Sequence, residues 1–303
     1  MESSRKPART IELAMIALVL IWGSNFAIVK SAVQQIQPLA FNALRFSAAS
    51  IVALSLTWLA ERDLSLLPQD RLSVLLLGFL SNFVYQMFFI NGIQRTRAGN
   101  SSLILAAVPI FVALINQIWG RERLRIQNWL GIALASVGIA LLVSGGKSTV
   151  QWSSQTAIGD LLTLGATISW AVYTVLSRTI MSRNSPMRVT AWMMASATPW
   201  MVLVAIPDLQ KQAWSSVSAQ SWLGLVFSAL LATGIGYFIW NTAVRQLGSA
   251  RTSVYSFLPP LVAVVVAWIL LGETIQMVQV LCGLLILCGV ALGRQQTHNG
   301  QRA

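Results

Sequence analysis

The stretch Trp22–Lys30, read WGSNFAIVK, lies inside the first long apolar segment of the chain, and its pattern returns in the second half. A shift of 148 residues places Trp22 on Trp170 and Pro38 on Pro186. Shifts of 150 and 151 residues give further matches near the end of each half: Asn91 with Asn241, Arg95 with Arg245, Pro109 with Pro260 and Glu122 with Glu273. The chain therefore consists of two copies of one unit of roughly 150 residues.

The composition indicates that lipid, rather than water, is the main solvent of this chain. Its 303 residues are 55% hydrophobic and only 10% charged, whereas a soluble domain carries about 25% charged residues. A net charge of +12 is typical of a membrane protein with positive cytoplasmic loops, and no basic run is dense enough to indicate nucleic-acid binding. We therefore expect a lipid bilayer as a partner and no nucleic acid.

Ten apolar segments follow one another along the chain, and each is about long enough to cross a hydrocarbon layer of about 30 Å as a helix. They are residues 11–30, 39–60, 72–94, 100–119, 126–144, 157–178, 187–206, 220–243, 252–271 and 276–293. Their length, and the lack of alternation between apolar and polar residues, exclude β-strands. The sequence predicts an all-α integral membrane protein with ten transmembrane helices.

The Lys and Arg residues orient these helices. With the N-terminus in the cytoplasm, fifteen of the 21 basic residues lie in cytoplasmic segments, five lie outside, and Arg45 lies within a helix. Positive charge concentrates on the cytoplasmic side of membrane proteins, so the tails 1–10 and 294–303 are predicted to be cytoplasmic. The first apolar segment has no small-residue cleavage site after a short core, which favours a retained helix over a signal peptide.

Each copy contains five helices, an odd number, so the second copy must enter the membrane upside down relative to the first. We predict two inverted five-helix repeats at 11–144 and 157–293, with a central cavity between them. Inverted repeats recur in secondary transporters, because exchanging the conformations of the halves moves the opening from one membrane face to the other. The alternative is a duplicated membrane scaffold that transports nothing.

Three motifs, taken in order, resemble those of a known family. They are the WGSNF-K element, Pro38 followed seven residues on by Arg45-Phe46, and a Pro-x12-Glu element before a glycine-rich helix, which is Pro109, Glu122 and Gly131 in the first half and Pro260, Glu273 and Gly283 in the second. Their order and repetition resemble the EamA-type members of the drug/metabolite transporter superfamily. The resemblance covers nearly the whole chain and implies a ten-helix exporter or facilitator of small metabolites with a central cavity.

The second copy departs from this pattern. Tyr173 stands where the first copy has Asn25, and Met193 falls near the position that corresponds to Arg45. The two half-sites are therefore chemically unequal, which suits an asymmetric substrate.

The candidate substrate-binding residues are ten polar or aromatic side chains: Trp22, Asn25, Arg45, Tyr85, Gln86, Trp170, Tyr173, Tyr237, Trp240 and Tyr255. Polar side chains in lipid need partners and therefore point inward. There they line a cavity and bind a ligand, or they join helices to one another. For the tryptophans, the alternatives are lining a cavity and packing between helices.

Arg45 is the most costly of these residues, since an unpaired Arg at the bilayer centre costs about 2.5–3.5 kcal/mol on insertion scales. One interpretation is an anchor for a substrate carboxylate or phosphate. The other is an Arg that extends to the outer headgroups or bonds backbone carbonyls, because Pro38 places it only about 10 Å below the outer edge at 1.5 Å per residue.

Five residues are candidates for kinks and gating: Pro109, Pro259, Pro260, Gly234 and Gly236. Proline removes an amide donor and clashes with the preceding turn, so it kinks a helix. Interruptions at matching places of two halves are typical of transporter binding sites and gates. The alternative is a harmless bend.

The sequence contains no signature of an enzyme, a metal site or a cofactor site. There is no Walker A loop and no GxSxG motif, and Cys282 and Cys288 are expected to be small buried hydrophobes. No Asp or Glu falls at the middle of a predicted helix, so the chain offers no obvious carboxylate for proton coupling. We predict that the protein is not an enzyme and uses no cofactor.

These observations predict a secondary transporter of the cytoplasmic (inner) membrane. Its substrate is expected to be a small metabolite, such as a neutral or aromatic amino acid, exported by alternating access. The alternative within transport is efflux of lipophilic cations, which aromatic faces can bind. The sequence is compatible with a monomer.

Overall fold

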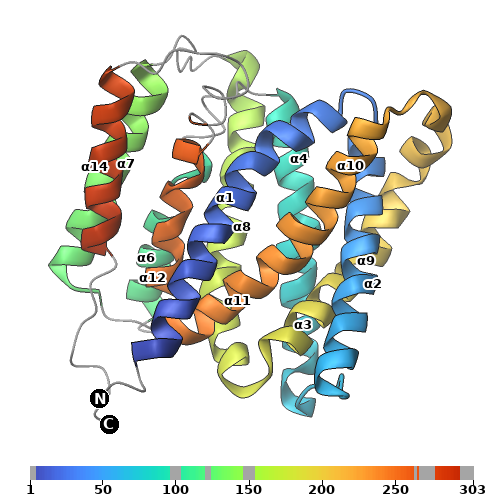
Figure 1. Cartoon of the computed structure of the whole chain (residues 1–303), viewed down its shortest axis with the longest axis horizontal. Helices are drawn as coiled ribbons and strands as arrows, with labels where there is room; N and C mark the ends of the chain where they lie inside the picture. Colours follow the sequence, from blue (N-terminus) through green and yellow to red (C-terminus); the bar gives the residue numbers. More distant parts are fainter. Residues whose placement is uncertain are drawn as a thin grey trace. The chain divides into compact units, whose positions relative to one another are not determined.

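The structure is a computed structural model that describes residues 5–95, 104–119, 124–145, 154–262, 265 and 277–293. These residues form helices joined by short turns, and none of them lies in a β-strand (Figure 1). Outside them lie the tail ends 1–4 and 294–303, the motif residues Glu122 and Glu273, and parts of the segments predicted at 100–119 and 252–271.

Helix is present in each of the ten predicted apolar segments, over the residues that the structure describes. The α-helices are α1 (Arg5–Ala32), α2 (Pro38–Glu61), α3 (Arg71–Gly78), α4 (Tyr85–Arg95), α6 (Val108–Trp119), α7 (Ile126–Gly145), α8 (Ser154–Arg183), α9 (Pro186–Lys211), α10 (Ala219–Phe227), α11 (Gly236–Leu247), α12 (Ser249–Ser253) and α14 (Met277–Gly293). Two π-helical segments, η2 (Phe79–Val84) and η4 (Ser228–Ile235), connect α3 to α4 and α10 to α11. Short 3-10 turns are η1 (Pro68–Asp70), η3 (Trp214–Ser216) and η5 (Val254–Phe257).

Several of these helices are long and apolar enough to cross a membrane. Five such stretches among the described residues are Pro38–Glu61, Pro68–Gly92, Ala157–Arg183, Pro186–Lys211 and Ala219–Leu247. Shorter apolar helices are Thr10–Asn25, Val108–Trp119, Ile126–Leu141 and Val280–Gly293. Large apolar side chains such as Leu13, Ile118 and Leu223 are exposed on these helices, as expected where the surrounding solvent is lipid. The chain therefore has the character of an integral membrane protein, and the count of ten spans stays a prediction.

Local sequence explains where α2 and α9 begin and where α2 ends. Each helix starts with a proline, Pro38 or Pro186, at the position where the missing amide donor costs nothing and the fixed φ suits a helix. The Ser185 hydroxyl caps α9 by accepting an amide hydrogen bond. Arg62 ends α2 in a left-handed conformation (φ 52°), and its amide donates to the Trp58 carbonyl. Prolines that correspond in the two copies thus start corresponding helices.

The helices form two compact units, and each unit combines helices from both halves of the sequence. The first unit contains residues 1–90 and 176–247, and the second contains residues 91–175 and 248–303. These units group helices that touch in space. They therefore differ from the two repeats predicted from the sequence, which group residues by sequence similarity.

In the first unit, α2 packs along α9, and the two helices run antiparallel (Figure 1). Just before α2 begins, the Gln37 amide donates at 2.7 Å to Oε1 of Gln212, which follows the end of α9. Toward the other end of the pair, Thr57 Oγ1 donates to the Met187 carbonyl at 3.4 Å. The start of each helix therefore lies beside the end of the other.

At the middle of this pair, the hydroxyls of Ser50 and Thr198 share a hydrogen bond of 2.7 Å. These residues are 148 positions apart, which is the shift that relates Trp22 to Trp170. Residues that correspond in the two copies therefore meet face to face.

In the second unit, α7 packs along α14, again antiparallel (Figure 1). Gly131, near the start of α7, faces Gly289 and Gly293, near the end of α14, and a Cβ at Gly131 would lie 2.6 Å from the Gly289 carbonyl oxygen. Glycine is required here because the two backbones approach so closely. Further along, Gly138 faces Ile286. Each unit thus contains one antiparallel pair of corresponding helices.

The two cysteines differ in exposure. Cys282 is buried, as expected, whereas Cys288 is exposed. The expectation for Cys288 is wrong because the positions of α14 that face α7 include 282, 286 and 289, and residue 288 lies on another face of the helix.

Candidate functional site

Arg45 on α2 is the centre of a polar cluster in the first unit. Its side chain is almost fully buried, with 5% exposed. Nη2 donates to Gln86 Oε1 at 3.0 Å, and Nη1 donates to Ser228 Oγ at 3.3 Å. The guanidinium carbon lies 5.7 Å from the centre of the Phe41 ring and 5.1 Å from that of Phe46. Among the described residues no carboxylate lies within ion-pair distance of Arg45, so amide, hydroxyl and aromatic groups hold this buried cation.

Two tyrosines surround the guanidinium. Tyr85 and Tyr237 lie within electrostatic range of Arg45, and Tyr237 also hydrogen-bonds the Gln86 side chain. The Tyr237 ring meets the Phe46 ring edge-on, with ring centres 6.5 Å apart. Gln86 therefore connects a cation from the first half of the sequence to a phenol from the second half.

An aromatic pair joins α1 to the eighth apolar segment in the same unit. Trp22 Nε1 donates to the Ala232 carbonyl at 2.9 Å, and the ring centres of Trp22 and Trp240 are 5.3 Å apart. Gly236 is required here, because a Cβ at this position would lie 2.8 Å from Trp22 Nε1. Gly234 is less confined, since the nearest obstacle to a Cβ is a carbonyl oxygen 3.4 Å away.

The two π-helical segments position these side chains, and the sequence analysis did not predict them. η2 begins at Phe79 and η4 at Ser228, 149 residues later, so they lie at matching places in the two copies. A π turn adds a residue to the helix, which changes the direction of the following side chains and frees carbonyls for other donors. Gln86 follows η2, and Ser228 opens η4, whose Ala232 carbonyl accepts the indole hydrogen bond. Such turns are rare and are frequent at functional sites.

The structure divides the ten predicted binding residues between the two units. The first unit contains Trp22, Asn25, Arg45, Tyr85, Gln86, Tyr237 and Trp240, and the second contains Trp170, Tyr173 and Tyr255. In the second unit the rings of Trp170 and Tyr173 lie 5.0 Å apart, and Tyr255 is buried in η5. Asn25 Oδ1 is buried and has no hydrogen-bond partner among the described residues. Substrate binding by these residues, and the central cavity, stay predictions.

The regular helix is interrupted just before the prolines that were predicted to kink it. Pro109 is the second residue of α6 and follows a turn at residues 106–107. Pro259 starts a helical stretch after a bend at Leu258, and Pro260 follows it. The breaks in the fourth and ninth apolar segments therefore precede the prolines, which occupy the first turns of the helices that follow.

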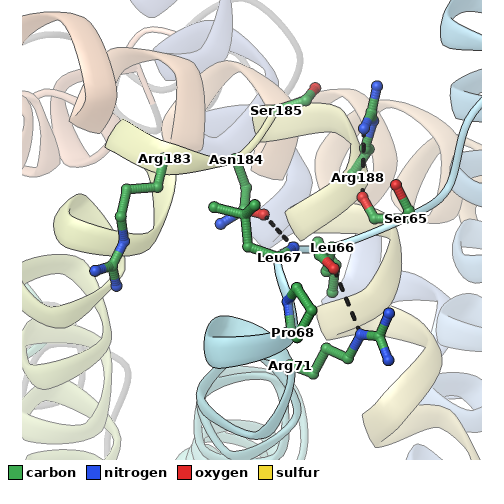
Figure 2. Close-up of a pocket in the computed structure, with 9 residues that line it drawn as sticks. All are labelled: Ser65, Leu66, Leu67, Pro68, Arg71, Arg183, Asn184, Ser185 and Arg188. Carbon is green, nitrogen blue, oxygen red and sulfur yellow. Dashed lines mark hydrogen bonds between the residues drawn. The ribbon is translucent and has the colours of Figure 1, made fainter.

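A pocket of about 390 Å³ opens between the α2–α3 loop and the α8–α9 turn (Figure 2). Its lining comes from the α2–α3 loop, the start of α3 and the α8–α9 turn: Ser65, Leu66, Leu67, Pro68, Arg71, Arg183, Asn184, Ser185 and Arg188. None of the predicted binding residues lines it. Figure 2 shows the side chains of Arg71, Arg183 and Arg188 pointing in different directions. No single small anion would therefore contact all three guanidinium groups.

Sequence reasoning missed Ser228, which hydrogen-bonds Arg45, and Asn42, which lies on the same face of α2 as Arg45. Ser228 is a small residue in an apolar helix, and nothing in the sequence indicates that it contacts α2. Asn42 carries a signal, because it lies three residues before Arg45 and therefore on the same face of α2. Asn42 is 1% exposed, and its Nδ2 has no hydrogen-bond partner among the described residues.

The model of the EamA-like transporter family matches this chain twice, at residues 9–144 and 157–293. These matches cover most of the chain, so the protein belongs to the EamA-like transporter family. It is a membrane transporter by family, and this class of protein is not enzymatic.

Relatives are similar to the chain over nearly their whole length. The "Uncharacterized transporter YyaM" of Bacillus subtilis (strain 168) is 25% identical over 281 residues, which are 92% of each chain. The "Probable amino-acid metabolite efflux pump" of Escherichia coli (strain K12) is 28% identical over 284 residues, which are 91% of each chain. The "Uncharacterized inner membrane transporter YedA" of Escherichia coli (strain K12) is 28% identical over 281 residues, covering 92% of this chain and 89% of the relative.

A protein of known crystal structure shares the fold. It superposes with a TM-score of 0.81 and covers 94% of this chain and 96% of its own, at 18% sequence identity. At this identity the likeness concerns the fold alone.

Proposed function

We propose that the chain is a secondary transporter that exports small amphipathic metabolites across the cytoplasmic (inner) membrane by alternating access. Neutral or aromatic amino acids are the proposed substrates. Membership of the EamA-like transporter family supports transport. The name of the Escherichia coli relative, "Probable amino-acid metabolite efflux pump", supports this substrate class at 28% identity.

One observation carries the alternating-access proposal: in each unit, corresponding helices of the two copies pack antiparallel. Ser50 meets Thr198, its counterpart 148 residues on, and Gly131 of the fifth apolar segment meets Gly289 of the tenth. Repeats that enter the membrane with opposite orientations produce such pairs. The pairs therefore support ten spans in two inverted repeats, 11–144 and 157–293, and the excess of basic residues on one side supports cytoplasmic termini.

The chemistry of the Arg45 cluster supports an amphipathic cargo. The Trp22–Trp240 pair and the Phe46 ring offer apolar contact. Gln86 and Arg45 offer hydrogen bonds at the centre of the cluster. A small molecule with one polar end and one aromatic or aliphatic end matches both kinds of surface.

The competing proposal, efflux of lipophilic cations, meets a specific obstacle. Arg45 is buried, and no carboxylate among the described residues neutralises it. Two like charges repel more strongly in a low-dielectric interior than in water. A cationic cargo near Arg45 would therefore be disfavoured unless it brought its own anion.

Reconstitution into liposomes tests the proposed transport. Vesicles containing the purified protein are loaded with radiolabelled L-phenylalanine, L-leucine or ethidium, and release is followed after dilution. We expect both amino acids to leave faster than from protein-free vesicles, with no acceleration for ethidium. Acceleration of ethidium alone would favour the cation alternative. No acceleration of any solute, by protein that elutes as one symmetric species in gel filtration, would contradict transport and favour a scaffold.

A further inference from the structure

We propose that Asn42 and Arg45 together form a seat for the carboxylate of the cargo, on one face of α2. The inference rests on the proposed transport function and narrows its substrate class to molecules that carry one carboxylate. It depends on the hydrogen-bonding capacity that the cluster leaves unused.

The guanidinium of Arg45 has one edge that the protein does not use. Of its five N–H donors, one on Nη2 reaches Gln86 and one on Nη1 reaches Ser228. The rings of Phe41 and Phe46 lie near the guanidinium. Nε is buried and has no hydrogen-bond partner among the described residues.

Asn42 supplies a second unused donor on the same face of α2. It lies three residues before Arg45 on α2, a spacing that puts two Cβ atoms about 5–6 Å apart on one helix face. Its Nδ2 is buried and likewise without a partner among the described residues. The two side chains are 1% and 5% exposed, so lipid headgroups and bulk water do not satisfy these donors.

A carboxylate satisfies both donors and supplies the missing negative charge. A buried donor without an acceptor costs free energy, and a buried cation without a counter-ion costs more. The two oxygens of a carboxylate can accept from Arg45 Nε and from Asn42 Nδ2 at the same time. Arg45 is charged whatever it bonds, but only a carboxylate adds an ion pair to these hydrogen bonds. The seat therefore favours a carboxylate over a neutral amide or alcohol.

The seat exists once, because the second copy lacks it. A shift of 148 residues carries Asn42 to Thr190 and Arg45 to Met193. Thr190 Oγ1 already accepts from Asn241 Nδ2 at 2.8 Å. The protein therefore has one seat, which holds one carboxylate of the cargo. The apolar part of the cargo lies beside the surrounding aromatic rings.

Matched pairs of ligands test the wild-type protein. The full-length protein in detergent is titrated with L-phenylalanine and L-phenylalaninamide, and with 3-phenylpropanoate and 3-phenylpropanamide, while its thermal midpoint is recorded. We expect each carboxylate to stabilise the protein and each amide to bind about 30-fold or more weakly, as loss of one partner of a buried charge pair implies. Equal stabilisation by acid and amide, or none by either acid, would overturn the inference.

Variants at Arg45 and Asn42 separate recognition from folding. Arg45→Gln is expected to reduce the preference for acid over amide to about threefold or less. Asn42→Leu, which keeps the size but removes the donor, should weaken acid binding about fivefold. Arg245→Gln removes the same charge from an exposed position on α11 and is expected to leave the preference unchanged.

Asn42→Asp gives the sharpest test, because it should raise the thermal stability of the free protein and weaken its binding of acids. The new carboxylate lies three residues from Arg45 and can pair with it. We expect a higher thermal midpoint without ligand and a loss of acid binding of at least tenfold, since the seat is then occupied from within. A lower midpoint together with retained acid binding would contradict the proposal.

Liposome assays keep this inference separate from the proposed function. Transport of amino acids without preference for the carboxylate form would overturn the seat and leave transport intact. Carboxylate-selective binding by a protein that moves no solute would leave the seat intact and overturn transport.

Discussion

The two ends of the α2–α9 pair are closed by different chemistry. Where α2 begins and α9 ends, most of the connecting groups are neutral amides and hydroxyls, with one long hydrogen bond to the Asp208 carboxylate, and we call this the amide end. Where α2 ends and α9 begins, carboxylates and guanidinium groups connect them, and we call this the ionic end. The two ends occupy corresponding positions in an antiparallel pair of corresponding helices, so they would be alike if the chemistry followed the duplication.

At the amide end, two glutamines cross-connect the α1–α2 turn and the α9–α10 loop. Gln212 Oε1 accepts from the Gln37 amide at 2.7 Å, and Gln212 Nε2 donates to the Gln35 carbonyl at 2.9 Å. Gln35 Oε1 accepts from the Ser218 amide at 2.8 Å and from the Ser221 hydroxyl at 3.1 Å. None of these groups changes its charge across the ordinary pH range.

At the ionic end, the buried carboxylate of Asp70 holds the α8–α9 turn. Asp70 is 1% exposed, and its oxygens accept from Arg183 Nη2 at 2.5 Å and Asn184 Nδ2 at 2.8 Å. Arg188 pairs with Glu61 at 2.6 Å at the end of α2. The comparison shows that duplicated backbones need not have duplicated chemistry. One end of the pair is held mainly by charged groups, and the other mainly by neutral ones.

The largest expected effect is at Asp70. Asp70→Ala removes two hydrogen bonds to a buried carboxylate, so we expect the free energy of unfolding to fall by about 2–4 kcal/mol. Denaturant unfolding in detergent measures it. Asp208→Ala is the matched control at the amide end. Among the residues that the structure describes, Asp208 accepts one hydrogen bond, from the Leu39 amide at 3.3 Å, so the expected loss is below about 1 kcal/mol. Equal losses of unfolding free energy at Asp70 and Asp208 would contradict the proposed difference between the two ends.

Gln35→Ala is expected to have the next largest effect. It removes the acceptor of two hydrogen bonds at the amide end, which predicts a loss of about 1–2 kcal/mol in the free energy of unfolding. Because both bonds join neutral groups, the loss should be the same in 50 mM and 1 M NaCl. A loss that depends on salt would show that charges control this end as well.

Salt should reveal a smaller contribution from Arg188 at the ionic end. Its ion pairs are partly exposed, and such pairs contribute about 0.2–1 kcal/mol each. We expect Arg188→Gln to destabilise the protein at low salt and to be nearly neutral in 1 M NaCl, where the screening length is about 3 Å. Arg245→Gln, on an exposed helix position, serves as the control. A salt-independent effect of Arg188→Gln would assign its role to packing.

The smallest expected effect is a local response of the ionic end to acid. The Ser65 amide first, and then the Ser65 hydroxyl, lower the pKa of Asp63, with a further contribution from Arg188. A lowered folded-state pKa means that the contribution of Asp63 is complete above its ordinary pKa of 3.8 and is lost as pH falls below that value. Hydrogen-exchange protection of the Ser65 amide should therefore fall below about pH 4, while that of the Gln37 amide stays constant. Parallel loss at both amides would indicate general unfolding instead.

Sequence patterns predicted the positions of the helices well and their local irregularities poorly. Apolar length and the proline at each start together placed α2 and α9 within a few residues. The same reasoning looked for interruptions at Pro109, Pro259, Pro260, Gly234 and Gly236. Gly234 lies in η4, but neither η2 nor η4 was predicted as a π-helical segment. Inside η4, the Ala232 carbonyl accepts a hydrogen bond from Trp22 of α1, and no local residue pattern encodes a contact between distant elements.

The individual residues of the candidate site could be predicted from the sequence, but their contacts could not. Arg45, Gln86 and Tyr237 attract attention individually, because polar groups in apolar segments are costly. Their meeting could not be derived, since it depends on how three helices are rotated about their axes. Asn42 was overlooked because an amide on an apolar helix is conspicuous only once its neighbour is known to be a buried cation without a carboxylate.

By itself, the sequence determined the solvent, the duplication and the apolar segments of this protein. These properties depend on composition and on spacing along the chain, which need no knowledge of contacts. Only the tertiary structure decided that corresponding helices pack antiparallel, that Ser50 meets Thr198, and which donors around Arg45 stay unused. Those facts depend on the rotation and register of packed helices, which many weak contacts set together.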